Sequence, residues 1–568
     1  MTDSVRSRLR WIVAVLTVGV GLVMFRLVSM QFGPNVPYFN DEFTKITQRR
    51  KEFDPPRGRI YDRTGALLAT NDTLFEISAS PPFVTNPEDA AETLAEILDR
   101  PRKELLAQLT GTSPYVLIER PVSAAIGNDL LALQEDPEGP DLSGIQFEVL
   151  PHRTYPAGPL AAQVLGFVGA DNTGYYGVED FYNDLLAGRP VVGVERTVPF
   201  EAALDPDPDQ GAHLTLTIDR EIQTMVEQTL RSALEANGAE TGTIIVMNPQ
   251  TGEILGMASW PTFNPNNYAR EPDTNLSNPA VSAQYEPGSV FKVVTMAAAL
   301  ESGAVTPETT YVDNGSVEVG GAYIRNWNGG AWGEQNMTGL LQHSLNVGAA
   351  TIAKMMGPTT FYNYLTAFGM GQVTNVDLAS EAAGHLKTPG DPDWYESDLG
   401  TNSFGQGVAV TSLQMITAIA AVANGGEMMQ PHVLLAVDDG GQVHRTRPTV
   451  LGRPISASTA NTLTNMLSVS LEQEASSALV PGYRIAGKTG TAQIPIPGGY
   501  DPEATVAAFV GWGPIDDPQF IVLVKIDRPK SAPWGSVVAA PIFSQLVQRL
   551  VVLMEIPPDD VRHALTAQ

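Results

Sequence analysis

The apolar positions nearest the start of the chain form one long run. Residues 11–25 are predominantly apolar, and after Arg26 the run resumes briefly. A helix needs roughly twenty apolar residues to cross a bilayer, and an arginine near its end can reach the interface. The pattern therefore predicts a transmembrane anchor over residues 11–32. Because three arginines lie within residues 1–10, that end is predicted to stay in the cytoplasm and the remainder to lie outside.

A cleaved signal peptide is the alternative explanation of the same run. Cleavage calls for a shorter apolar region followed by a small-x-small site. Residues 26–34 offer no good site of that kind. The sequence therefore favours an uncleaved anchor.

Further along, apolar residues alternate or cluster as they do in strands. Residues 214–218 alternate, and Asp219 then caps a segment with helical periodicity. Two apolar runs at 243–247 and 253–258 are joined by turn residues, which is typical of a hairpin. The other predicted elements are strands at 504–510 and 520–526 and an apolar helix at 542–554. Strands from both ends of this region, with helices between them, predict an α+β fold.

The segment that precedes this region has a different character. Residues 57–65 fit a turn, a short strand and a second turn, and residues 87–98 have helical periodicity. We therefore predict an irregular, β-rich and non-catalytic module over residues 33–212. The α+β domain is predicted to span residues 213–556, and a tail follows over residues 557–568.

Composition narrows the chemistry that the chain can perform. Its 568 residues carry a formal net charge of -28 and include no cysteine. Disulfides and cysteine-based metal or redox sites are therefore excluded. Such an acidic chain would repel a phosphate backbone, so nucleic acid is not expected as a partner. We expect neither a metal nor a cofactor.

Three short motifs follow one another in the predicted α+β domain. Ser289 stands three residues before Lys292, Ser344 stands two residues before Asn346, and a Lys-Thr-Gly triplet begins at Lys488. Each motif alone is weak evidence. The ordered set is typical of serine acyl-transferases that act on penicillin-like compounds. Covalent acyl transfer by a serine nucleophile is therefore the predicted chemistry.

The first motif supplies a nucleophile and a base. Ser289 is predicted to lie at the start of a helix over residues 290–301, because Pro287 and Gly288 end the irregular stretch before it. Its backbone N–H then has no partner within the helix and can point at developing negative charge. Lys292 lies on the same helical face. It can accept a proton only as a neutral amine, so its pKa must fall by about three units from the reference value of about 10.4, through burial and a second cation nearby.

The third motif is predicted to lie on an edge strand. Gly490 leaves room for a substrate backbone to pair with that strand. The N–H of Thr491 can supply a second oxyanion donor beside that of Ser289. Lys488 is the candidate second cation, although the same lysine taken alone would be interpreted as an exposed strand residue.

The second motif also has two interpretations. A serine in this position is by default part of a loop or a helix cap. In the functional interpretation Ser344 relays a proton to the leaving amine, and Asn346 hydrogen-bonds the substrate amide. His343 is interpreted as a structural neighbour, because nothing pairs it with a set of metal ligands.

With these motifs, the chain resembles the class B penicillin-binding proteins over nearly all of its length. Further stretches similar to family motifs lie at 57–65, 153–158 and 174–179 in the first module, and at 403–407 and 540–543 in the second domain. The resemblance implies a penicillin-binding, serine β-lactamase-like transpeptidase domain, an antiparallel sheet with helices on both sides. It also implies that the first module is a non-catalytic pedestal or dimerisation-type module.

The resemblance implies a monofunctional peptidoglycan D,D-transpeptidase without a cofactor. Ser289 would form an acyl-enzyme with a stem peptide and release the terminal D-alanine. Lys292 would be the base, and the second motif would have the roles given above. Lys488, Thr489 and Thr491 would hold the terminal carboxylate of the donor.

The resemblance also implies partners and a location. The partners are peptidoglycan stem peptides with their lipid-linked precursor, β-lactams as covalent inhibitors, and a SEDS-type glycosyltransferase in the bacterial cytoplasmic membrane. The last is implied because no glycosyltransferase domain is evident in the sequence. Asn346 with residues 347–350, and the compact stretch between Gly169 and Gly174, are more similar to division-type than to elongation-type members. Septal synthesis is therefore favoured over elongation.

Two other functions would use the same motifs. A membrane-anchored β-lactamase of the class A type needs a glutamate and an asparagine four residues apart to hold a water, and after Ser344 no glutamate is followed by asparagine at that spacing. A β-lactam-binding receptor with a vestigial site is the second alternative. Against it, every side chain of the three motifs is present.

Overall fold

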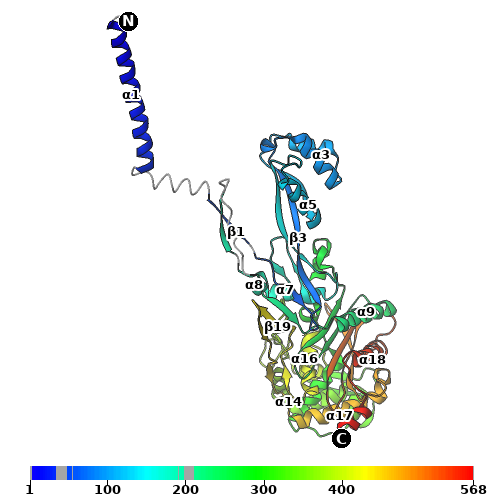
Figure 1. The fold of residues 1–568 in the computed structure, drawn as a ribbon. Helices are drawn as coiled ribbons and strands as arrows, with labels where there is room; N and C mark the ends of the chain where they lie inside the picture. Colours follow the sequence, from blue (N-terminus) through cyan, green and yellow to red (C-terminus); the bar gives the residue numbers. More distant parts are fainter. Residues whose placement is uncertain (1–2, 33–47, 54, 190, 197–209, 567–568) are drawn as a thin grey trace. The chain divides into compact units, whose positions relative to one another are not determined.

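The structure is a computed structural model that describes residues 3–32, 48–53, 55–189, 191–196 and 210–566 (Figure 1). The chain divides into two compact units. One consists of residues 1–56 and 188–210, and the other of residues 57–187 and 211–568.

The first unit contains one long helix and one short ladder. The helix is α1, Asp3–Phe32. The ladder pairs β1, Gln48–Phe53, in antiparallel fashion with β8, Val191–Arg196.

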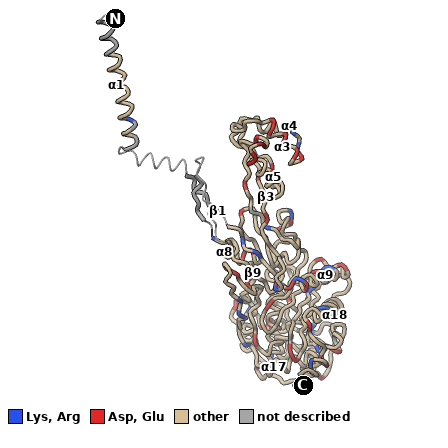
Figure 2. The backbone as a smooth tube through the Cα atoms, viewed as in Figure 1, with Lys and Arg blue, Asp and Glu red and all other residues tan. Residues whose placement is uncertain are grey.

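The surface of α1 is apolar and exposed along most of its length. The side chains of residues 11–26 are all exposed, and Arg26 is the one charged residue in the sequence between positions 11 and 32. In Figure 2 the coloured part of α1 is accordingly almost entirely tan. The predicted anchor therefore lies within one continuous helix. The arginines on which the predicted orientation depends lie in residues 1–10, and their side chains are not among those that the structure describes.

By length and composition, one helix of the described residues could cross a membrane. It is α18, Gly535–Leu553, and most of it is buried inside the second unit, as expected of a core helix. The segment Trp11–Arg26 of α1 is apolar over a shorter length.

Residues 57–187 fold around one long strand. That strand, β3 (Leu67–Ala79), pairs with β4 (Val116–Ser123) and β5 (Ile145–Thr154), beside helices α3 (Pro87–Leu98), α4 (Arg102–Leu109) and α5 (Ala124–Glu135). The helix predicted at 87–98 is confirmed as α3. Phe75 on β3 is buried among leucines of the helices, and Gly127 permits this contact because a Cβ there would lie 2.1 Å from the Phe75 ring.

This module shares a sheet with the rest of the second unit. The shared strands are β2 (Ile60–Tyr61), which pairs with β3 and with β9 (His213–Leu216), and β19 (Leu434–Asp439), which pairs with β9 and with β20 (Gln442–Arg445). The domain boundary predicted at residue 212 therefore falls directly before β9. The sheet that contains β9 has strands from both sides of this boundary.

The α+β part of the second unit is built on a five-stranded antiparallel sheet. Its strands follow the order β11 (Ile254–Trp260), β10 (Thr241–Met247), β24 (Phe520–Asp527), β23 (Gly499–Gly513) and β22 (Ala486–Ile496). Strands from both ends of the domain thus lie side by side, as the sequence predicts. The edge strand β22 carries the Lys-Thr-Gly triplet.

Helices cover both faces of this sheet. One face packs against α9 (Arg220–Asn237) and α18, and the other packs against α16 (Ser412–Ala423), which in turn contacts α12 (Lys292–Glu301). Successive residues of β24 face the two cores in turn, Val522 toward the first and Leu523 toward the second. A strand covered on both faces has a continuous apolar sequence. The predicted α+β fold, with helices on both sides of the sheet, is confirmed.

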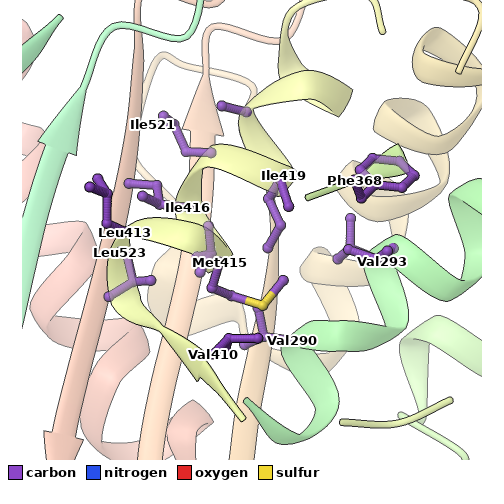
Figure 3. Close-up of a cluster of buried hydrophobic side chains, with 14 of the residues drawn as sticks. Val290, Val293, Phe368, Val410, Leu413, Met415, Ile416, Ile419, Ile521 and Leu523 are labelled. Atoms are coloured by element: carbon purple, nitrogen blue, oxygen red, sulfur yellow. The ribbon is translucent and has the colours of Figure 1, made fainter. Parts of the chain in front are cut away.

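The helix α16 is the centre of the second core. All of its residues are buried, which is characteristic of a helix that is apolar on every side. Figure 3 shows Leu413 and Ile416 of α16 beside Ile521 and Leu523 of β24, with Val290 below Met415. The segment that carries Ser289 is therefore packed against the most buried helix of the domain.

The remaining helices and strands of this domain surround these two cores. They include α13 (Met337–Gln342), α14 (Asn346–Ala367), α15 (Glu396–Asn402), α17 (Ala457–Glu474), and two hairpin-like pairs, β13 (Thr310–Asp313) with β16 (Gly333–Asn336) and β14 (Ser316–Val319) with β15 (Ala322–Arg325).

A buried ionic cluster joins distant parts of the first module. The carboxylate of Glu179 on α7 (Gly177–Phe181) accepts from Arg57 Nε and from Arg153 Nε, each at 2.7 Å, and all three side chains are at most 3% exposed. The guanidinium of Arg153 also donates to the carbonyl of Gly58 at 2.7 Å. Arg57 donates to Asn183 Oδ1 at 3.0 Å. One carboxylate thus fixes the entry to the module against β5 and α7.

The charge of Glu179 is expected to be essential for stability. Glu179→Gln keeps the shape of the side chain but leaves two buried guanidinium groups without a carboxylate. We expect the free energy of unfolding to fall by about 3–5 kcal/mol, measured as a lower thermal midpoint of the full-length protein. The control is Arg453→Ala, which breaks a partly exposed pair with Glu427 and should cost less than about 1 kcal/mol. Equal effects of the two substitutions would contradict this account.

Candidate active site

Ser289 lies in a tight turn at the beginning of α12. The turn is a 3-10 helix, η3, over Gly288–Phe291, and α12 follows from Lys292. The sequence predicts an α-helix from residue 290, and the structure differs by this first turn. The reason is Gly288, whose φ of 58° brings the chain into the helix through a left-handed residue.

Lys292 connects the first and second motifs. Its Nζ lies 2.9 Å from Ser289 Oγ, 2.7 Å from the carbonyl oxygen of Ser344 and 2.8 Å from Asn346 Oδ1. Ser344 Oγ is 3.2 Å from the same nitrogen. The side chain is 1% exposed, so these oxygens replace water around it. The structure therefore brings together the four side chains that the sequence singles out in these two motifs.

The partners of Lys292 differ in what they can do. A backbone carbonyl and an amide oxygen only accept hydrogen bonds, whereas a hydroxyl can donate or accept. A neutral amine has two N–H groups and one lone pair. If Ser344 O and Asn346 Oδ1 take the two N–H groups, the lone pair remains for a hydroxyl proton. The geometry thus suits proton transfer from Ser289 Oγ to Lys292 Nζ.

Ser344 has an unusual backbone. It lies between α13 and α14 with a φ of 53°, in the left-handed region that serine rarely adopts. This conformation lets both its carbonyl and its hydroxyl oxygen approach Lys292. Residues held in such conformations cluster at functional sites. The default interpretation of this serine as a loop residue is correct for its location, but its oxygens are directed at the candidate base.

Asn346 is the first residue of α14, where helix geometry fixes its direction. Its Oδ1 accepts from Lys292, and its Nδ2 donates to the carbonyl of Arg325 at 3.3 Å. These two contacts agree on the orientation of the amide.

His343 stacks on Trp332 with ring centroids 4.3 Å apart, which is a packing contact.

The third motif lies on β22 beside the serine turn. Lys488 is fully buried, and its Nζ donates to Thr489 Oγ1 at 3.2 Å. Thr491 Oγ1 accepts from the backbone N–H of Gly535 at 3.0 Å. Lys488 is therefore not the exposed strand lysine of the alternative interpretation.

Three glycines allow the motifs to pack this closely. A Cβ on Gly490 would lie 2.6 Å from Val290 Cγ2, so this glycine lets the strand approach the serine turn. The sequence suggested instead that it leaves room for a substrate. A Cβ on Gly405 would lie 2.4 Å from the carbonyl oxygen of Gly288, and one on Gly288 would lie 2.9 Å from that of Thr491.

A cleft of about 730 Å³ opens over these residues. Ser289, Ser344, Asn346, Thr489 and Thr491 all line it. Among the described residues no group of three or more His, Asp or Glu side chains could hold a metal ion. The lining of the cleft offers hydroxyl and amide groups for chemistry.

Sequence reasoning missed much of the cleft wall. The further lining residues include Trp327, Trp332, Phe404, Gln406, Gln493, Thr505, Pro533 and Trp534. They come from loops and from strands β22 and β23, far apart in the chain. One sequence signal could have pointed to this wall, namely the two tryptophans in the glycine-rich stretch 327–333.

A partly buried acid stands close to the nucleophile in sequence. Glu286 Oε1 accepts from the N–H of Gly407 at 3.0 Å and from the hydroxyl of Tyr500 at 3.3 Å. Its Oε2 is buried and makes no hydrogen bond. Burial raises the pKa of the Glu286 carboxyl, and the two hydrogen bonds oppose this rise only in part.

Two family descriptions match the chain. Residues 242–548 match the penicillin binding protein transpeptidase domain, and residues 52–196 match the penicillin-binding protein dimerisation domain. The first match alone covers more than half of the sequence.

Relatives of similar length are also found. The chain is 33% identical to stage V sporulation protein D of Bacillus subtilis, over 96% of this chain and 85% of that protein. It is 30% identical to the peptidoglycan D,D-transpeptidase FtsI of Escherichia coli, over 90% and 86% of the two chains.

Solved structures show the same fold. Penicillin-binding protein 3 of Mycobacterium tuberculosis, in complex with aztreonam, superposes with a TM-score of 0.70 at 28% identity, covering 89% of this chain and 98% of that one. Penicillin-binding protein 2X of Streptococcus thermophilus gives a TM-score of 0.78 at 25% identity, covering 89% and 80%.

The buried carboxyl of Glu286 is expected to make stability depend on pH. Because its pKa is raised in the folded state, its favourable contribution is complete below the unfolded pKa of about 4.3 and is lost as pH rises through the folded pKa. Glu286→Gln removes this loss. The thermal midpoint of the variant relative to the natural protein should therefore increase between about pH 4 and pH 7. The exposed control Glu334→Gln should show a difference that does not vary with pH in this way. A constant difference for both variants would contradict the assignment.

Proposed function

The chain belongs to the class B penicillin-binding proteins, and we propose that it is a peptidoglycan D,D-transpeptidase that cross-links stem peptides through an acyl-enzyme on Ser289. One observation carries the proposal. Lys292 Nζ lies 2.9 Å from Ser289 Oγ while Ser344 and Asn346 hold the same nitrogen. A nucleophile, its base and groups that orient the base are the elements of covalent acyl transfer.

The first half of the reaction forms the acyl-enzyme. Ser289 Oγ attacks the carbonyl carbon of the penultimate D-alanine, and its proton passes to neutral Lys292. The backbone N–H groups of Ser289 and Thr491 stabilise the oxyanion, where one such donor is typically worth about 3 kcal/mol. The peptide C–N bond then breaks, and the departing D-alanine amine receives a proton through the hydroxyl of Ser344. Ser344 Oγ is 3.2 Å from Lys292 Nζ, a distance that supports this relay.

The second half transfers the acyl group. An amine of a neighbouring stem peptide attacks the ester carbonyl and loses a proton to the same Lys292 and Ser344 pair. The bond from the carbonyl carbon to Ser289 Oγ breaks, and the serine recovers its proton. A new amide bond cross-links the two stems, and the enzyme returns to its initial state.

The third motif binds the donor. We assign the terminal carboxylate of the stem peptide to Lys488, Thr489 and Thr491, and the substrate amide to Asn346. Both threonines line the cleft, and Nζ of the buried Lys488 lies 3.2 Å from the hydroxyl oxygen of Thr489. A lysine behind the hydroxyl of Thr489 favours a carboxylate in front of that hydroxyl.

β-Lactams use the same atoms. Ser289 Oγ attacks the lactam carbonyl, the ring C–N bond breaks, and the nitrogen takes the proton. The released amine stays tethered to the acyl group in the cleft. The result is a slowly hydrolysed acyl-enzyme and a covalently inhibited protein.

The apolar helix α1 supports a place for the protein in the bacterial cytoplasmic membrane. An exposed helix with a single charge between residues 11 and 32 needs an apolar environment. We propose that α1 is a single-pass anchor and that the C-terminal domains lie outside the cytoplasm. A SEDS-type glycosyltransferase in the same membrane would supply the glycan strand, and lipid-linked precursor would reach the site through it. Similarity to FtsI favours division over elongation.

Covalent labelling tests the nucleophile and its base. Ser289→Ala should abolish labelling of the full-length protein by a fluorescent penicillin, because it removes the nucleophilic hydroxyl that lies 2.9 Å from Lys292 Nζ. Lys292→Ala should lower the acylation rate about 10²–10⁴-fold, the usual worth of a general base. Ser302→Ala, at the other end of α12, should label as the natural protein does. Labelling retained by Ser289→Ala would refute the assignment.

Hydrolysis of nitrocefin separates this function from the β-lactamase alternative. A transpeptidase should release about one equivalent of product and then turn over slowly, because the chain has no glutamate–asparagine pair at the class A spacing after Ser344 to hold a hydrolytic water. Fast steady hydrolysis would favour the lactamase. Labelling without any cross-linking of stem peptides, tested together with the membrane partner, would favour the receptor.

Localisation tests the membrane and division assignments. A fluorescent fusion of the full chain should sediment with membranes and gather at midcell. Removal of residues 1–32 should release it from the membrane fraction. Ser289→Ala should localise normally, because it changes only the cleft. Uniform sidewall fluorescence would argue for elongation instead.

A further inference from the structure

Trp327 and Trp534 meet within the lining of the cleft. Their ring centroids are 5.4 Å apart with an interplanar angle of 68°, an edge-to-face contact. Both indoles line the same cleft as Ser289, and they are 55% and 41% exposed. This aromatic contact is therefore made at the substrate cleft and not in either hydrophobic core.

Trp327 is fixed to the wall of the cleft that carries the second motif. The carbonyl of Arg325 accepts from Asn346 Nδ2 at 3.3 Å, and Asn326 Oδ1 accepts from the N–H of Val347 at 3.1 Å. The indole Nε1 donates to the carbonyl of His343 at 3.4 Å. The position of this indole is thus tied to Ser344 and α14.

Trp534 is fixed to the wall that carries the third motif. The N–H of Gly535 donates to Thr491 Oγ1 at 3.0 Å, and the carbonyl of Pro533 accepts from Thr505 Oγ1 at 3.0 Å. A Cβ on Gly535 would lie 2.2 Å from the carbonyl oxygen of Gly490, so this segment lies directly on β22. The position of this indole is thus tied to the strand that borders Ser289.

We propose that the contact between Trp327 and Trp534 is a latch that sets the width of the cleft and so selects acyl donors by bulk. It rests on the proposed function, because the selection acts on acylation of Ser289. The two walls are held by separate motifs, and any movement that separates them must break this contact. A compact donor reaches Ser289 while the indoles remain joined, whereas a donor with a bulky substituent needs them apart.

The size of the effect follows from the strength of aromatic pairs. An edge-to-face pair favours its closed arrangement by a factor of about 2–10 beyond the area that it buries. Loss of the latch should therefore raise the acylation rate of bulky donors by about this factor relative to compact ones.

The experiment compares two β-lactams on the full-length protein in detergent. 6-Aminopenicillanic acid has no acyl side chain, and a penicillin that bears a fluorescent dye has a very large one. Trp327→Ala and Trp534→Ala should each raise the ratio of the bulky to the compact acylation rate by about 2–10-fold. The double variant should give no further rise, because either single substitution already removes the one contact.

Two further variants serve as controls for the latch. Trp534→Phe retains an aromatic ring and should raise the ratio above that of the natural protein, but by less than Trp534→Ala does. This rise over the natural protein can be measured even if the alanine variant fails to fold. Phe83→Ala, an exposed aromatic residue outside the cleft, should leave the ratio unchanged.

Either an unchanged ratio in the single variants or a double variant equal to the product of the singles would overturn the latch. The product would mean that the indoles act as two independent steric walls. Failure of both β-lactams to acylate the natural protein would instead overturn the proposed function.

Discussion

The hydrogen bonds around the nitrogen of Lys292 are the interaction on which the site depends. They join a serine turn, a strained loop and the first residue of α14 within 3.2 Å of one buried atom. Other features of the domain serve this arrangement. The wholly buried α16 supports the segment that carries the nucleophile, and glycines at 288, 405 and 490 let three backbone segments approach one another. A buried amine with poorly placed acceptors would be costly, so the packing and the chemistry constrain each other.

The sequence predicted the chemistry better than the shape of the cleft. Ser289 and Lys292 are close in sequence, so helical spacing alone brings them together. The turn at Ser289 was predicted as α-helix and is a 3-10 turn, because periodicity does not reveal the backbone conformation of Gly288. Trp327 and Trp534 were not predicted, since residues that line a cleft from distant loops meet only through tertiary packing. The α+β fold was predictable because its strands and helices carry strong and different periodicities.

The ionic cluster around Glu179 shows a second limit of sequence reasoning. Arg57, Arg153 and Glu179 lie in stretches that resemble family motifs, but no local pattern shows that they meet. Together they leave one excess positive charge in a buried site, where ion pairs contribute more to a unique arrangement than to net stability. The cluster therefore fixes the position of the chain at residues 57–58, directly before it enters the shared sheet at β2.

That shared sheet constrains the order in which the parts of the protein can fold. The short strand β2 emerges early in synthesis, yet it is completed by β9 and, through β9, by β19, which is made far later. Pairings between segments so distant in the chain form slowly, because the intervening loop must first be closed. While the chain is being made, this sheet consequently carries an unfinished strand edge until β19 has been added, and such an edge is a site for chaperone capture or misassembly.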